Sequence, residues 1–137
     1  MRAFIDTSSL FKKYVDENGS KKMEELLKTV SEIIISPITI LEINSIIERR
    51  LKEKSLSFSD AKWIEKEFLH DFSFFGVVGF NDLLVGECIR VIRKYQLKVL
   101  DGLQLSSAII SKPELFIVSD KRLFNAATSE LPRVELV

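Results

Sequence analysis

The stretch RAFIDTSS at residues 2–9 decides how the rest of the chain can be arranged. A short apolar run ends at a carboxylate and three hydroxyl residues, and apolar residues at helical spacing follow, which is typical of a strand, a tight turn and a helix. An uninterrupted apolar strand is expected at the centre of a parallel sheet. Asp6 would then lie at the carboxyl end of that strand, where open α/β sheets bind their ligands. The alternative is that Asp6 only caps the helix.

The composition is that of an ordinary globular protein. Of the 137 residues, 46% are hydrophobic and 29% are charged, and 20 basic and 20 acidic residues give no net charge. This balance does not indicate a general nucleic-acid or membrane binder, so a polyanion would have to be bound by a local basic patch or through metal ions. We expect residues 1–137 to form a single domain.

The sequence also limits the possible chemistry. The chain shows neither a signal-like N-terminus nor a run of transmembrane length, so we expect a cytoplasmic protein. Cys88 is the only cysteine and His70 the only histidine, which excludes an intrachain disulfide, cysteine-rich zinc sites and motifs with paired histidines. Cys88 falls in an apolar helical stripe and is expected in the core. Any catalysis must therefore depend mostly on carboxylates.

Strands and helices are predicted to alternate along the chain. Apolar and β-branched runs predict strands at residues 2–5, 33–35, 72–80, 115–118 and 134–136. Amphipathic spacing and cap residues predict helices at residues 10–15, 21–30, 37–54, 59–70, 82–95, 101–110 and 121–128. The alternation implies an α/β fold in which helices cover both faces of a parallel sheet, and the third and fourth helices should form an antiparallel hairpin.

Four acidic residues are expected to meet at one pole of this fold. Strand carboxyl ends and helix amino ends share a pole when βαβ connections are right-handed. Asp6 and Asp120 end strands, Asp101 opens a helix and Glu42 lies in the first turns of another. Clustered carboxylates repel one another, and Mg²⁺ or Mn²⁺ would neutralise them and activate water against a phosphodiester. For Glu42 and Asp101 the alternative is a simple interaction with the helix dipole.

Four short motifs resemble those of a known family: FIDTS at residues 4–8, ILEI at 40–43, LDGLQLSSA at 100–108 and VSDKRL at 118–123. In this order the chain resembles PIN domains, and most of all the VapC-type ribonuclease toxins of bacterial and archaeal toxin–antitoxin pairs, over essentially its whole length. The resemblance implies a PIN-like three-layer α/β/α sandwich with a five-stranded parallel sheet and a protruding helical hairpin.

The resemblance also implies an activity, which is Mg²⁺- or Mn²⁺-dependent endonucleolytic cleavage of RNA. The residues that it implies as catalytic and metal-binding are Asp6, Glu42, Asp101 and Asp120. Thr7 and Ser119 match small hydroxyl positions of the family and are expected to orient ligands or a bound water.

The chain departs from the family pattern at two positions, because many relatives have Ala and His where it has Gly102 and Gln104. These departures put details of substrate contact in doubt, but not the metal ligands. Basic residues near the motifs are candidates for phosphate contacts, although charged helix faces are usually only solvated. They are Lys12, Lys13, Arg49, Arg50, Lys121 and Arg122.

The implied partner is a VapB-like antitoxin that lies across the acidic pole, and we further expect a homodimer. The antitoxin should bring an arginine to the carboxylates and bind a groove lined by Leu10, Tyr14 and Ile47. One alternative function is that of a catalytically silent PIN domain acting as an RNA-binding or protein-interaction module. Another is a different Mg²⁺ phosphotransfer enzyme, which is disfavoured because Ser8 occupies the place where phosphatases usually have a second Asp.

Overall fold

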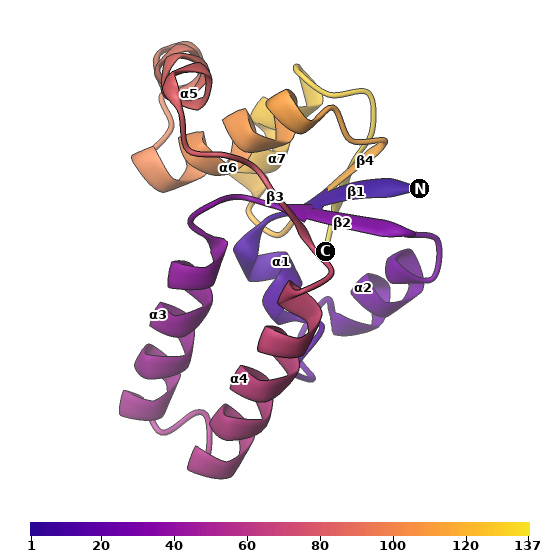
Figure 1. Ribbon diagram of the computed structural model, residues 1–137, viewed down its shortest axis with the longest axis vertical. Coiled ribbons are helices and arrows are strands. Elements are labelled where there is room, and N and C mark those ends of the chain that lie inside the picture. Colours follow the sequence, from indigo (N-terminus) through magenta and orange to yellow (C-terminus); the bar gives the residue numbers. More distant parts are fainter.

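In the computed structural model, which describes residues 1–137, five parallel strands form one sheet (Figure 1). The strands are β1 (Arg2–Ile5), β2 (Glu32–Ile35), β3 (Gly76–Val77), β4 (Leu115–Val118) and β5 (Val134–Leu136). Their order is β3-β2-β1-β4-β5, so the first strand is central, as predicted. Ala3, Phe4 and Ile5 are fully buried, which explains why both faces of this strand are apolar.

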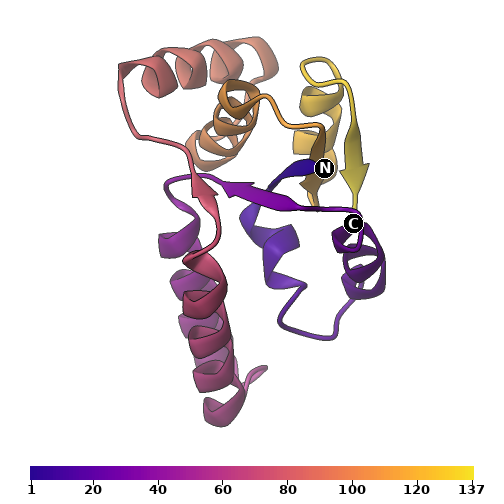
Figure 2. The same cartoon turned by 45° about the vertical axis from the view of Figure 1, so that its right-hand side comes forward.

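Seven helices surround the sheet, and none of them is both long and apolar enough to cross a membrane. They are α1 (Thr7–Phe11), α2 (Ser20–Leu27), α3 (Thr39–Lys52), α4 (Phe58–Phe72), α5 (Asp82–Tyr95), α6 (Val99–Ser111) and α7 (Lys121–Thr128). Figure 2 shows helices on both faces of the sheet, and α3 and α4 project from it as a hairpin. These features confirm the predicted three-layer sandwich and its protruding hairpin.

Alternate residues of the strands divide between two cores. Ala3 and Ile5 of β1 pack with α1, α3 and α4 on one face, whereas Phe4 packs with α6 and α7 on the other. Helix α5 packs mainly on α6, because its buried residues Leu84 and Cys88 cluster with Leu103, and Val91 near its carboxyl end joins the core of the second layer. The expected core position of Cys88 is thus confirmed.

Several predicted boundaries were wrong, including the end of α2 at Leu27 and the start of α3 at Thr39, and three of the errors concern the sheet or the site. The strand expected at residues 72–80 is only two residues long, because α4 continues to Phe72. The ring of Phe72 lies 5.8 Å from that of Phe68, one helical turn earlier, so the aromatic residues serve helix packing and not a strand. The first helix is a short α1 that starts at Thr7 directly after Asp6, and α6 begins at Val99, so Asp101 lies within its first turn.

The departure at Gly102 has a packing explanation. A Cβ atom at this position would lie 2.6 Å from Cγ1 of Ile92 and 3.2 Å from Sγ of Cys88, where α5 crosses α6 closely. An Ala at this position therefore fits only if the side chain of Ile92 moves.

We predict that Gly102→Ala lowers the free energy of unfolding. Overpacking lowers the free energy of unfolding by about 1–3 kcal/mol, whereas the higher helix propensity of Ala raises it by about 1 kcal/mol. Urea unfolding of the metal-free protein measures the net loss. The double variant Gly102→Ala/Ile92→Ala should lose less than the sum of the two single variants, because the second change removes the clash. A single variant as stable as the wild type would contradict this explanation.

Candidate active site

Two of the predicted acids lie at the ends of neighbouring strands. Asp6 follows β1 and accepts a hydrogen bond from the backbone amide of Ser9 at 2.9 Å, and Asp120 follows β4 and accepts one from the amide of Leu123 at 2.8 Å. Each carboxylate thus caps a helix, so the capping function considered for Asp6 is real. A hydrogen bond of 2.8 Å between the hydroxyls of Ser9 and Ser119 ties the two turns together.

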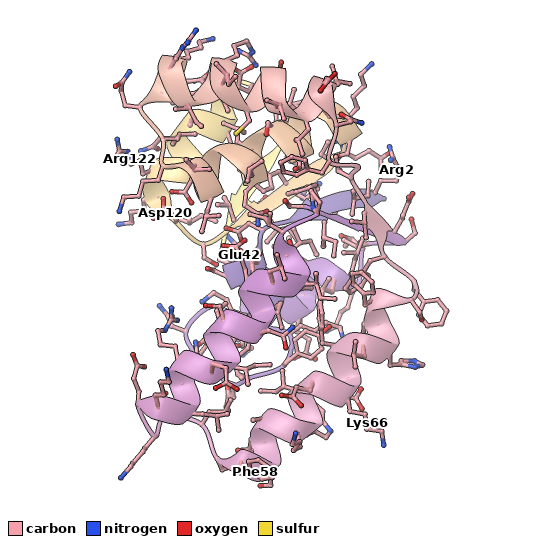
Figure 3. The ribbon with its side chains drawn as sticks, turned by 60° about the vertical axis from the view of Figure 1, so that its left-hand side comes forward. Arg2, Glu42, Phe58, Lys66, Asp120 and Arg122 are labelled. Atoms are coloured by element: carbon pink, nitrogen blue, oxygen red, sulfur yellow. The ribbon has the colours of Figure 1, made fainter.

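The other two predicted acids lie in the first turns of helices at the same pole. Glu42 belongs to α3 and Asp101 to α6. Figure 3 shows Glu42 and Asp120 on the same side of the molecule, whereas Arg2, at the amino end of β1, lies on the opposite side. The four acids thus lie at the carboxyl pole of the sheet, but no three of them come close enough to form a group that could hold a metal ion.

The acids affect one another electrostatically. Burial raises the pKa of Asp6 from 3.8 to about 6, with a smaller contribution from the charge of Glu42, although the hydrogen bonds from Ser9 and Ser119 act in the opposite direction. Burial also raises the pKa of Asp101, and the charges of Asp120 and Glu42 raise it further. Repulsion thus acts between Asp6 and Glu42, between Glu42 and Asp101, and between Asp101 and Asp120.

The carboxylate of Glu42 is held by two neighbours. Its Oε1 atom accepts hydrogen bonds from Oγ1 of Thr7 at 2.8 Å and from Nε2 of Gln104 at 2.7 Å. Nε2 of Gln104 also donates to Oγ1 of Thr7 at 2.9 Å, and Thr39 lies 3.2 Å from the same hydroxyl. Thr7 therefore orients an acid, as expected. The hydroxyl of Ser119 contacts Ser9, and only the backbone of Ser119 acts on a carboxylate, that of Asp6.

The donor atoms at this pole suit a hard divalent cation. Carboxylate oxygens are the ligands that Mg²⁺ and Mn²⁺ prefer, and no hydrogen bond involves Oε2 of Glu42, Oδ2 of Asp120 or either carboxylate oxygen of Asp101. No three acidic side chains lie close enough to form a complete ligand set as they are placed. Side-chain rotations would have to bring the free oxygens together around an ion.

Two residues of the site were missed or undervalued from the sequence. Ser9 is three residues after Asp6, and Gln104 three residues after Asp101, so each lies on the same helix face as an acid that we had identified. This spacing of three residues from an acid is the sequence feature that could have indicated Ser9 and Gln104 as site residues. For Gln104 the difference from the family pattern drew attention to the position but did not predict the contact with Glu42.

The six basic candidates differ in how they are engaged. Arg50 pairs with Glu17 at 2.8 Å, and the ammonium group of Lys12 is bound to the carbonyl of Asn18 at 2.7 Å. Lys13 pairs with Asp71 at 2.6 Å, and Arg122 donates to the carbonyl of Gln96 at 2.6 Å. The two that are exposed and make no ion pair or side-chain hydrogen bond are Arg49 and Lys121.

Arg49 is the free cation that lines a groove together with a site acid. A groove of about 240 Å³ starts at Thr7 and Glu42 and includes Ser45 and Arg49 in its wall. A larger groove of about 450 Å³ continues from Arg49 between α1 and α3. The acids are thus connected to a surface path that carries an unpaired guanidinium.

Comparison with known proteins agrees with this architecture. The family model described as "PIN domain" matches residues 3–128, and no curated protein matches the chain in sequence. A toxin–antitoxin complex from Klebsiella pneumoniae is similar in structure at 18% identity and a TM-score of 0.66, covering 89% of this chain and 89% of that chain.

Two further solved structures show the same fold. VapBC2 from Rickettsia felis, bound to a promoter DNA fragment, is 14% identical with a TM-score of 0.69 and covers 100% of this chain and 99% of that chain. FitAcB from Neisseria gonorrhoeae is 10% identical with a TM-score of 0.71 and covers 97% and 96%. Since the family model spans nearly all of the described fold, including all four acids, the chain belongs to the PIN domain family.

Proposed function

We propose that the protein is a Mg²⁺- or Mn²⁺-dependent endoribonuclease, with residues 1–137 as a single PIN domain, and that it acts as the VapC-like toxin of a type II toxin–antitoxin pair. PIN domains are in general nucleases. The observation that carries the proposal is the placement of four carboxylates at the carboxyl pole of the sheet, where Glu42 repels Asp6 and Asp101, and Asp120 repels Asp101. Such repulsion weakens a fold unless a cation relieves it.

The four acids and the residues that hold them have separate roles in the proposed site. Asp6, Glu42, Asp101 and Asp120 would hold the ion, which when bound supplies a polarised water and neutralises charge on the phosphodiester. Thr7 fixes the carboxylate of Glu42, and the helix caps fix Asp6 and Asp120. Because one oxygen of Glu42 and one of Asp120 are already engaged with the protein, the remaining oxygens are available at the pole.

The test is cleavage of a panel of structured RNAs by the purified protein, with and without Mn²⁺, beside the Glu42→Gln variant. Cleavage that requires Mn²⁺ and disappears in the variant is expected. A folded protein that neither cleaves RNA nor responds to metal would contradict the proposal and favour a silent RNA-binding or protein-interaction module.

Arg49 is expected to bind a phosphate of the RNA next to the cleavage site. We predict that Arg49→Gln raises KM for RNA several-fold with little change in kcat, and lowers the slope of log affinity against log salt concentration by about 1, because one phosphate contact is lost. The matched control is Lys66→Gln, an exposed cation on the α4 hairpin away from Glu42 and Asp120 (Figure 3). Equal effects of the two substitutions would refute a specific contact.

The proposed protein partner is a VapB-like antitoxin that brings a cationic side chain to the acids. The structural relatives include toxin–antitoxin complexes. The predicted groove needs correction, since Leu10 is fully buried in the core and cannot contact a partner. Tyr14 and Ile47 are also almost fully buried. A shallow groove of about 240 Å³ between α3 and α4 is available instead, and Leu69 is its exposed apolar side chain.

We also propose a homodimer formed through the surface of β3 and α5. Large apolar side chains are exposed along this one segment, and β3 is an edge strand whose outer side has no partner. The exposed residues are Phe74, Val77, Phe80, Leu83, Val85 and Ile89.

A further inference from the structure

A buried amide from α6 is part of the site although it carries no charge. Gln104 is only 4% exposed, and its Nε2 atom donates to Oε1 of Glu42 at 2.7 Å and to Oγ1 of Thr7 at 2.9 Å. Since Thr7 donates to the same oxygen of Glu42 at 2.8 Å, side chains from α1, α3 and α6 form a closed triangle of hydrogen bonds.

Chemistry fixes the direction of this amide. An ionised carboxylate only accepts hydrogen bonds, so the NH₂ group of Gln104 and not its carbonyl must face Glu42. As a result, Oε1 of Gln104 is buried without any hydrogen-bond partner. A buried acceptor without a partner weakens a fold. The main effect of the amide is therefore to orient the carboxylate of Glu42 and not to stabilise the fold.

We propose that Gln104 is a positioning residue that determines which oxygen of Glu42 faces a bound divalent cation. It holds Oε1, together with Thr7, and leaves Oε2, which makes no hydrogen bond, directed to the ion. This inference rests on the proposed metal site. Hydrogen-bond partners of ligating carboxylates usually contribute about 10–100-fold to metal affinity, and Gln104 is expected to contribute within this range.

The experiment is a titration of the full chain with Mn²⁺, followed by the electron paramagnetic resonance signal of the free ion, together with thermal melts of the metal-free protein. Gln104→Met keeps the length of the side chain and removes both donors. We expect it to weaken Mn²⁺ binding about 10–100-fold without lowering the metal-free melting temperature, because the unpartnered Oε1 is removed as well. Gln104→His restores an N–H donor and should bring the affinity back most of the way.

Ser107→Ala is the matched control, since Ser107 lies three residues further along α6, is fully buried, and also has a hydroxyl without a partner. It should leave Mn²⁺ affinity unchanged. If Gln104→Met does not fold, Gln104→Asn replaces it, because this amide is one methylene too short to reach Glu42.

Wild-type affinity in Gln104→Met or Gln104→Asn would overturn the inference. So would a weakened affinity that is accompanied by a lower metal-free melting temperature and not rescued by His, because Gln104 would then serve the fold alone. Failure of the proposed function looks different: the wild-type protein itself would not bind Mn²⁺, or Glu42→Gln would bind it as well as the wild type does.

Discussion

Asp6→Asn is expected to make the metal-free protein more stable while removing most of its response to Mn²⁺. Burial raises the pKa of Asp6 from 3.8 to about 6, so the ionised form that prevails at pH 7 destabilises the native state. A rise of this size corresponds to about 3 kcal/mol of unfolding free energy. Asn avoids this cost and can still accept the capping hydrogen bond from the amide of Ser9.

The measurement is urea unfolding at pH 7 with and without Mn²⁺, and Asp71→Asn serves as the control. Asp71 is a partly buried carboxylate that pairs with Lys13 and accepts a hydrogen bond from Tyr14. Its replacement should lower stability and leave the response to Mn²⁺ intact. If Asp6→Asn instead destabilises the metal-free protein, Asp6 serves the helix cap and the repulsion argument fails.

Divalent metal should stabilise the wild-type protein strongly, and the effect should depend on pH. A ligand that binds only the native state adds about 2.7 kcal/mol at a free concentration 100 times its dissociation constant. Protons compete for the same carboxylates, so stabilisation by Mn²⁺ should be largest at pH 7 and above and should shrink as the pH falls through about 6, the pKa of Asp6.

The metal-free protein should show the opposite trend. A carboxyl group whose pKa is higher in the native than in the unfolded state adds to the free energy of unfolding at low pH, where it is protonated in both states. This added free energy is lost as the pH rises from about 4 to about 6. Asp6 and Asp101 both have raised pKa values. Thermal melts at pH 5 and pH 7, with and without millimolar Mn²⁺, test both trends. Melting temperatures that do not change when Mn²⁺ is added at pH 7 would contradict a metal site.

Much of the fold could be predicted because local signals agreed with the tertiary structure. The apolar run before Asp6 correctly predicted the central strand. Asp120 was correctly predicted to lie between β4 and α7, and the bounds of both of these elements were correct. The placement of the four acids at one pole followed from the handedness of βαβ connections alone, whereas their distances from one another did not. The helix predicted at residues 82–95 also has the observed bounds of α5, which Asn81 caps by accepting a hydrogen bond from the amide of Leu84.

The errors arose where tertiary contacts decide between local alternatives. The aromatic segment after His70 has high strand propensity, but Phe72 and Phe75 pack on Phe68 and the strand is reduced to two residues. The function of Gln104 depends on a contact 62 residues away in the chain, with Glu42. Neither periodicity nor cap chemistry contains that information.

The central claim is that the four acids bind a divalent cation, and anomalous diffraction from crystals grown with Mn²⁺ tests it most directly. We predict an anomalous peak at the carboxyl pole of the sheet, with carboxylate oxygens of at least two of the residues Asp6, Glu42, Asp101 and Asp120 at about 2.0–2.3 Å, the distance of metal–oxygen bonds for ions of this kind. Crystals of Asp6→Asn should lose the peak. A wild-type structure without a peak at this pole, at Mn²⁺ concentrations that support RNA cleavage, would contradict the claim.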